Sequence, residues 1–168
     1  NCISWERARA HCQARDADLP TEAQFQYVAS CLEGRVYPWG NDPPSCADAV
    51  FAPPPAFFGV EVRCPGAWVG PPGSTNRDRV LIEGLGARSS DVVVDLAGNV
   101  SEYALDSWNL TTESCWSGMG VYTDPVCTTP TRVASQQKLH SLLSGSFANP
   151  AGFLPAAYRR PAVSFDVA

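Results

Sequence analysis

The sequence has no long hydrophobic run. No stretch approaches the ~20 consecutive apolar residues that a membrane-spanning helix requires, although 45% of the 168 residues are hydrophobic. A chain of this length is large enough to bury a core of its own. We therefore expect one soluble domain over residues 1–168, without a transmembrane segment.

Basic residues are also few. The chain has 12 Lys and Arg against 17 Asp and Glu, which gives a net charge of −5, and the basic residues are scattered along the sequence. Proteins that bind nucleic acid neutralise phosphates with clustered basic side chains. The composition therefore argues against nucleic acid as a partner.

Charged residues of both signs amount to only 17% of the chain, whereas proline and glycine contribute 15 and 13 residues. These two residue types interrupt helices and strands and occur in turns. Regular secondary structure should therefore be sparse, with long ordered loops between residues 34 and 79.

The seven cysteines include no Cys-x-x-Cys pair, so disulfides are favoured over a metal site. They occupy positions Cys2, Cys12, Cys31, Cys46, Cys64, Cys115 and Cys127. Disulfides place the protein in an oxidising compartment. We predict that Cys46 pairs with Cys64 and Cys115 with Cys127, because each pair would close a loop. The odd number leaves one cysteine that is either a free thiol or pairs beyond an end of this chain.

Two helices are predicted near the N-terminus. Residues 4–15 have helical spacing with Glu6 in the first turn, where the helix dipole favours a negative charge. A second helix begins at Thr21, because Thr21 and Gln24 have the spacing of a capping box. Its apolar face consists of Phe25, Val28, Ala29 and Leu32.

Strand signals are weaker. The β-branched residues 92–94 predict a short buried strand, and residues 139–146 offer a second candidate. Residues 80–90 have the composition of an exposed insertion.

Residues 95–102, Asp-Leu-Ala-Gly-Asn-Val-Ser-Glu, have the pattern of a calcium loop. Calcium takes six to eight oxygen ligands, and a turn at Gly98 can direct successive carbonyl oxygens toward a cation that two carboxylates also bind. The alternative is that Asp95 caps a turn and Glu102 is solvated.

Several motifs occur in the order seen in one protein family. They are Ser-Trp-Glu-Arg-Ala at 4–8, Leu-Pro-Thr-Glu-Ala-Gln-Phe-Gln-Tyr at 19–27, Tyr-Pro-Trp-Gly at 37–40, Val69-Gly70 after Cys64, residues 95–102, Ser-Gly-Ser-Phe at 144–147, and Tyr158-Arg159. In this ordered set the chain resembles the formylglycine-generating enzyme, or sulfatase-modifying factor, family over nearly its whole length.

The resemblance implies a C-type-lectin-like α+β fold of the formylglycine-generating-enzyme type. Such a fold has little regular secondary structure, with two helices, short antiparallel strands and long loops. It also implies a partial domain, because the family usually has further strands before the first motif and a strand after residue 168 that is often followed by cysteine. That cysteine would pair with Cys12 or Cys2, and Cys31 with the other of these two.

For the calcium loop, the resemblance implies the side chains of Asp95 and Glu102 and the carbonyls of Gly98 and Val100 as ligands. A second calcium site of the family is not expected, because its asparagine would fall near Ala49.

Catalysis in the family uses two cysteines whose thiolates bind copper(I), a soft metal that prefers sulfur. The matching positions are Asn149 and Leu154, and Ser101 stands where the family more often has tryptophan. Neither position therefore holds a cysteine. Ser146 has no predicted base, because the sequence ties neither His11 nor His140 to it.

These observations favour a noncatalytic, calcium-stabilised binding or structural module, a pseudoenzyme that is secreted, periplasmic or on the cell surface, from a bacterium. Loops at 149–153 and 111–129 would meet a protein, peptide or glycan. A ligand groove would involve Ser146, Asn149, Phe153, Tyr158 and Arg159. Two alternatives stay open: a copper-dependent oxidase that converts a substrate cysteine to formylglycine, and a C-type-lectin-like ligand-display protein.

Overall fold

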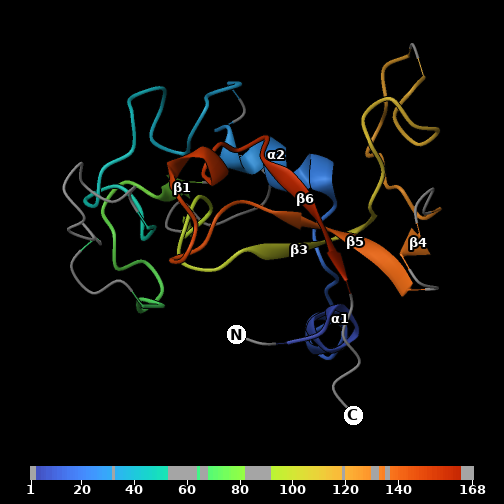
Figure 1. Ribbon diagram of the computed structural model, residues 1–168, viewed down its shortest axis with the longest axis horizontal. Coiled ribbons are helices and arrows are strands. Elements are labelled where there is room, and N and C mark those ends of the chain that lie inside the picture. The colour runs from blue at the N-terminus through green and yellow to red at the C-terminus, as the bar shows by residue number, and fades with distance from the viewer. Residues whose placement is uncertain are drawn as a thin grey trace. The chain divides into compact units, whose positions relative to one another are not determined.

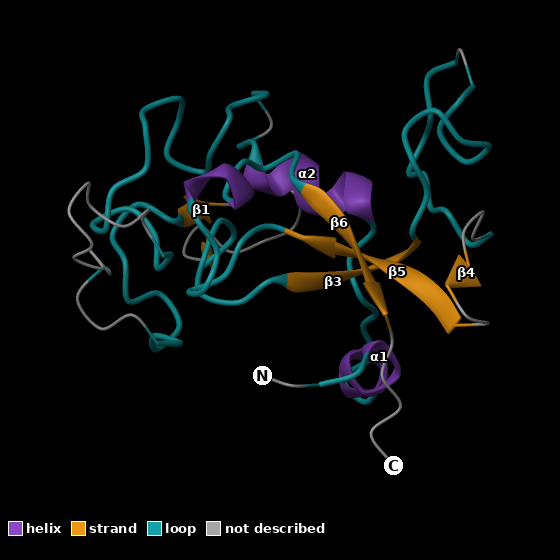
Figure 2. Ribbon diagram, in the orientation of Figure 1, coloured by secondary structure: helices purple, strands orange, loops and turns teal. Residues whose placement is uncertain are grey.

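The computed structural model describes residues 3–31, 33–52, 64, 68–81, 92–118, 120–129, 133–134 and 137–163. Loops make up most of this chain (Figure 2), as its proline and glycine content predicts. Its contacts form two compact units. We call Asn1–Phe25, Glu102–Leu143 and Arg159–Ala168 the sheet unit, and Gln26–Ser101 and Ser144–Tyr158 the loop unit. No helix in the described residues is long and apolar enough to cross a membrane.

Helix α1 spans Trp5–Gln13 with Ser4 as its N-cap, and it ends two residues before Arg15, the predicted end. The side chain of Ser4 accepts a hydrogen bond from the backbone N–H of Arg7, which satisfies one of the free donors of the first turn. The helix has no buried residue and is held to the sheet through Trp5. The indole N–H of Trp5 donates to the carbonyl of Ala104 at 2.7 Å.

Helix α2 spans Glu22–Ala29 and begins with the predicted capping box. The backbone N–H of Gln24 donates to the hydroxyl of Thr21 at 3.1 Å, and the backbone N–H of Thr21 donates to the amide oxygen of Gln24 at 3.0 Å. Phe25 and Ala29 are buried, as the helical spacing predicts. The helix ends at Ala29, and Leu32 lies outside the described residues.

The sheet unit is organised around β5, which spans Gln137–Leu143 and overlaps the predicted strand at 139–146. It pairs antiparallel with β3, β6 and β4, which span Glu102–Ser107, Arg159–Val163 and Val133–Ala134 (Figure 1). Its last residue, Leu143, is opposite Glu102 in β3 and Arg159 in β6. The first residues of β3 and β6, two segments far apart in the sequence, therefore meet at the last residue of β5.

The predicted strand at 92–94 forms, but it is not buried. Strand β2, Val92–Val94, pairs antiparallel with β1, Arg79–Leu81, in a sheet of only two strands. Val92 is 40% exposed, and Val93 and Val94 are half-buried. Residues 80 and 81 of the predicted insertion belong to β1, and residues 82–90 lie outside the described residues.

Both predicted disulfides form, Cys46 with Cys64 and Cys115 with Cys127. The first belongs to the core of the loop unit, where Cys64 is buried in a cluster with Ala49, Phe51, Ala97 and Leu154. Cys12 and Cys31 are free thiols, whereas Cys31 was expected to pair with either Cys12 or Cys2. Cys2 lies outside the described residues.

His140 lies buried in β5, where its ring stacks on that of Trp5 with 3.9 Å between centroids and 11° between planes. Burial penalises the charged imidazolium and lowers the pKa of His140 below its usual value. The folded protein therefore takes up a proton here at lower pH than the unfolded chain does. The stability that the neutral ring provides above pH ~6.5 is lost as the pH falls through the folded pKa.

We expect His140→Phe to flatten this dependence, because phenylalanine keeps an aromatic stack and cannot titrate. Denaturant unfolding at pH 7 and pH 5 should show the wild type losing more stability than the variant. His11→Gln, at the other histidine of the chain, which is exposed, serves as the control variant. Equal losses of stability in wild type and His140→Phe would contradict the assignment of this pH dependence to His140.

Candidate functional site

The segment at 95–102 is organised around a buried carboxylate that the sequence did not single out. Asp78 is fully buried and accepts hydrogen bonds from the backbone N–H groups of Ala97 at 3.0 Å and Gly98 at 3.1 Å. Its own carbonyl accepts from the N–H of Asp95 at 2.9 Å. Burial raises the pKa of Asp78 to about 6, although the two amides favour the charged form.

Asn99 joins this segment to three others in the loop unit. Its side-chain oxygen accepts from the N–H of Gly70 at 2.9 Å, and its side-chain nitrogen donates to the carbonyl of Gly70 at 3.1 Å. Its backbone N–H donates to Val50 at 2.8 Å, and its carbonyl accepts from Phe147 at 2.9 Å. The left-handed φ of 64° suits asparagine, which tolerates this region better than most residues.

Gly98 is required because the chain passes close to Val50. A Cβ atom at position 98 would lie 2.5 Å from the carbonyl oxygen of Val50, a distance that no side chain permits. The sequence predicted glycine at a turn, and the structure gives a close approach of two backbones as the reason.

The predicted calcium ligands in this segment are oxygen atoms suited to a hard cation. One carboxylate oxygen of Asp95, Oδ2, accepts from the N–H of Gly73 at 2.8 Å and from the side chain of Asn99 at 3.2 Å. The other oxygen, Oδ1, accepts no hydrogen bond from the described residues, and neither do the carbonyls of Gly98 and Val100. These oxygens are of the type that calcium prefers, and the calcium site itself stays a prediction.

Glu102, the remaining predicted ligand, begins β3 in the sheet unit and is partly buried. The described residues contain no group of three or more His, Cys, Asp or Glu side chains that could hold a metal ion. A metal at 95–102 would therefore depend on backbone carbonyls as well as on the two carboxylates.

The predicted groove residues fall into separate local contacts. The hydroxyl of Ser146 donates to the side-chain oxygen of Asn149 at 2.7 Å, while the N–H of Asn149 donates to the carbonyl of Ser146 at 2.9 Å. The rings of Phe153 and Tyr158 pack with 4.7 Å between centroids. Ser146 and Asn149 therefore close a tight turn, and the groove itself stays a prediction.

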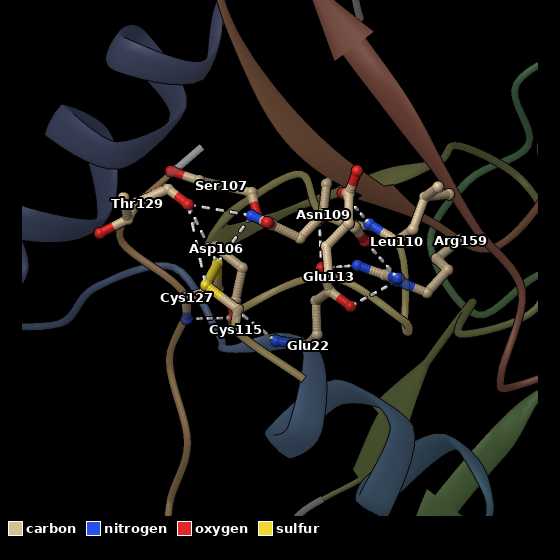
Figure 3. Close-up of a disulfide and its surroundings, with 11 residues drawn as sticks. Glu22, Asp106, Ser107, Asn109, Leu110, Glu113, Cys115, Cys127, Thr129 and Arg159 are labelled. Atoms are coloured by element: carbon tan, nitrogen blue, oxygen red, sulfur yellow. Dashed lines mark hydrogen bonds and ion pairs between the residues drawn. A yellow bond between two sulfur atoms is a disulfide. The ribbon is translucent and has the colours of Figure 1, made fainter. Parts of the chain in front are cut away.

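Arg159, the fifth groove residue, belongs to the sheet unit and is engaged there (Figure 3). Its Nη2 donates to Oε1 of Glu22 at 2.7 Å, its Nε lies 2.6 Å from Oε2, and its guanidinium lies over the ring of Trp108. Glu22 also accepts a hydrogen bond from Ser141. Burial raises the pKa of Glu22 although Arg159 opposes that shift.

The two positions that match the family's cysteines hold side chains with structural contacts. Leu154 is fully buried in the core of the loop unit, and its Cδ2 would lie 2.9 Å from a Cβ on Gly145. Asn149 accepts from Ser146, and its carbonyl accepts from the N–H of Ala52 at 2.9 Å. Neither side chain is a ligand for copper(I).

Comparison with known proteins agrees with the family that the sequence motifs resemble. A model of the sulfatase-modifying factor enzyme 1-like domain matches residues 1–166. The chain is also similar in fold to PvdO from Pseudomonas aeruginosa, with a TM-score of 0.58 and 16% identity, over 98% of this chain and 56% of that one.

Two curated relatives share one short stretch with this chain. It is 50% identical over 40 residues to the inactive C-alpha-formylglycine-generating enzyme 2 of Bos taurus and 48% identical over 40 residues to that of Mus musculus. Each match covers 23% of this chain and 13% of the relative, so the chain aligns with only a small part of those proteins.

The contacts of Asn99 predict different costs for two substitutions. Asn99→Gly removes three side-chain hydrogen bonds, which should destabilise the protein by roughly 3 kcal/mol. Asn99→Ala removes the same bonds but keeps a Cβ at a left-handed φ, where alanine should be about 1 kcal/mol less favourable than glycine. Denaturant unfolding of both variants measures the difference. An alanine variant as stable as the glycine variant would contradict the left-handed conformation at this position.

Proposed function

This chain belongs to the family of sulfatase-modifying factor enzyme 1-like domains, and within that family we propose that it is a noncatalytic, calcium-stabilised binding module that acts outside the cytoplasm. The observation that carries the proposal is Leu154, because an apolar side chain fills the core where the resemblance places a copper-binding thiolate.

Among the described residues two cysteines are free, Cys12 and Cys31, and neither stands at position 149 or 154. The Sγ of Cys31 contacts the carbonyl of Pro38 at 3.2 Å. The word "inactive" in the names of the two mammalian relatives also agrees with a noncatalytic role, although it describes those proteins.

The oxygen ligands at 95–102 support calcium as a structural ion. Asp95, Gly98, Val100 and Glu102 would hold it, and the ion would supply charge that stabilises the irregular segment between β2 and β3. The hydrogen bonds to Asp78 and Asn99 order the same segment from within the protein.

Two disulfides support a location outside the cytoplasm, because thiols stay reduced in most cytosolic proteins. They also tie down loops that have few regular hydrogen bonds. Rigid loops on a small scaffold are suited to presenting a binding surface. We therefore propose a protein, peptide or glycan as the partner.

The noncatalytic assignment is tested by incubating the full-length protein with a Cys-x-Pro-x-Arg peptide, copper(I), oxygen and a reductant. Mass spectrometry should detect no formylglycine, while an active enzyme of the family converts the same peptide in parallel. Conversion that disappears when copper is withheld would show that the protein is an oxidase and that the match of positions 149 and 154 is wrong.

The calcium assignment predicts that Glu102→Gln lowers thermal stability in calcium and changes it little in chelator. A ligand at 100 times its dissociation constant stabilises by about 2.7 kcal/mol, or very roughly 5–10 °C for a chain of this size. Thermal unfolding with calcium and with chelator measures the effect. Glu33→Gln is the control, because Glu33 forms an exposed ion pair with Arg35. Equal losses in both solutions for Glu102→Gln would refute the calcium site.

A further inference from the structure

The segment at 109–129, which we call the disulfide loop, is anchored by a buried amide at its base. Asn109 is fully buried, and its side-chain nitrogen donates to the sulfur of Cys127 at 2.9 Å and to the carbonyl of Thr129 at 3.0 Å (Figure 3). The disulfide between Cys115 and Cys127 closes the loop above this point. The two ends of the disulfide loop are thus held together.

The base of the loop is also fixed to the sheet unit. The carboxylate of Asp106 in β3 accepts from the N–H of Cys127 at 2.8 Å through one oxygen and from the N–H of Glu22 at 2.8 Å through the other. The carbonyl of Cys127 accepts from the N–H of Ser107 at 2.6 Å. Arg159 adds a bond to the carbonyl of Asn109 at 2.7 Å. The base of the loop is therefore hydrogen-bonded to β3, and Asp106 and Arg159 link it to Glu22 and β6 within the sheet unit.

Within the loop, side chains bond to nearby backbone. The carboxylate of Glu113 accepts from the N–H of Leu110 at 2.7 Å. The hydroxyl of Tyr122 accepts from the N–H of Gly118 at 2.8 Å, and its ring meets that of Trp116 edge to face with 6.2 Å between centroids. These contacts reduce the conformational entropy that a partner would have to remove on binding.

The ordered loop presents apolar side chains to solvent. Val121 is 100% exposed, Tyr122 and Val126 are each 43% exposed, and Leu110 is 39% exposed. Single exposed apolar residues are common on protein surfaces. Here four occur in 17 consecutive residues (110–126) of one cross-linked loop, which extends away from β3, β5 and β6 in Figure 1. Long ordered loops of this kind are usually functional.

The charge of the disulfide loop indicates which kind of partner it can bind. Residues 89–131 contain no Lys, Arg or His, and the disulfide loop itself carries Glu113 and Asp124. Asp124 is exposed and accepts a hydrogen bond from the neutral side chain of Gln24 at 3.1 Å. The loop is therefore apolar and acidic, and its electrostatic complement is a basic surface.

We propose that the disulfide loop docks onto a partner protein that presents basic side chains around an apolar contact. The proposal rests on the function proposed above and specifies which loop binds and what it binds. Val121 and Val126 supply the apolar contact, while Glu113 and Asp124 supply the complementary charge. A nucleic acid or an anionic membrane surface would be repelled by the same charges.

The experiment selects peptides from a phage-displayed random library on the immobilised full-length protein. We expect enriched sequences to place Lys or Arg beside aliphatic or aromatic residues. A synthetic copy of the most enriched peptide should bind Val121→Ser/Val126→Ser at least about ten-fold more weakly than the wild type. Its affinity should also fall as salt rises from 50 to 500 mM. Val121 is fully exposed and Val126 is 43% exposed, so the variant should fold.

The matched control is Leu81→Ser, which removes an apolar side chain that is 60% exposed on β1 in the loop unit. It should leave peptide affinity unchanged. Selected peptides without basic residues, equal binding by wild type and the valine variant, or failure to select any peptide would each overturn the proposal. The assay for formylglycine is independent, so an active oxidase would refute the proposed function without relying on this result.

Discussion

Hydrogen bonds between buried side chains and loop backbone are the constraint on which this protein depends. In the loop unit, Asp78 and Asn99 satisfy backbone groups that regular strands would otherwise pair. In the sheet unit, Asp106 and Asn109 serve backbone groups of the disulfide loop in the same way. A buried backbone group without a partner costs free energy, so a chain with so few helices and strands needs such side chains.

Local signals predicted the local features well. The Thr21 capping box, both disulfide pairs and the strand at 92–94 could be predicted because each depends on residues close in sequence or on loop closure. The roles of Asp78 and Asn99 could not. Each bonds to backbone 19 to 29 residues away, and a polar side chain in a proline- and glycine-rich sequence gives no sign of such a partner.

The ordered motifs predicted the family, but they could not define the site. Arg159 was expected in a groove, yet it pairs with Glu22, 137 residues earlier in the sequence. Leu154 is informative because of where its side chain packs. Because it belongs to the core together with the disulfide-bonded Cys64, the loop unit has a packed interior that does not require a copper centre. Stability and the family's chemistry are separable in such a scaffold.

The burial of two asparagine side chains has a consequence for how the protein can be made. Asn99-Val100-Ser101 and Asn109-Leu110-Thr111 both match the Asn-x-Ser/Thr acceptor for N-linked glycosylation. In the folded protein both amides are buried and donate to neighbouring groups. A sugar could therefore be attached only before folding. It would then block the hydrogen bonds that these two amides donate in the folded protein. Expression in a eukaryotic secretory pathway sets glycosylation against folding, whereas a bacterial periplasm provides disulfide formation without that competition.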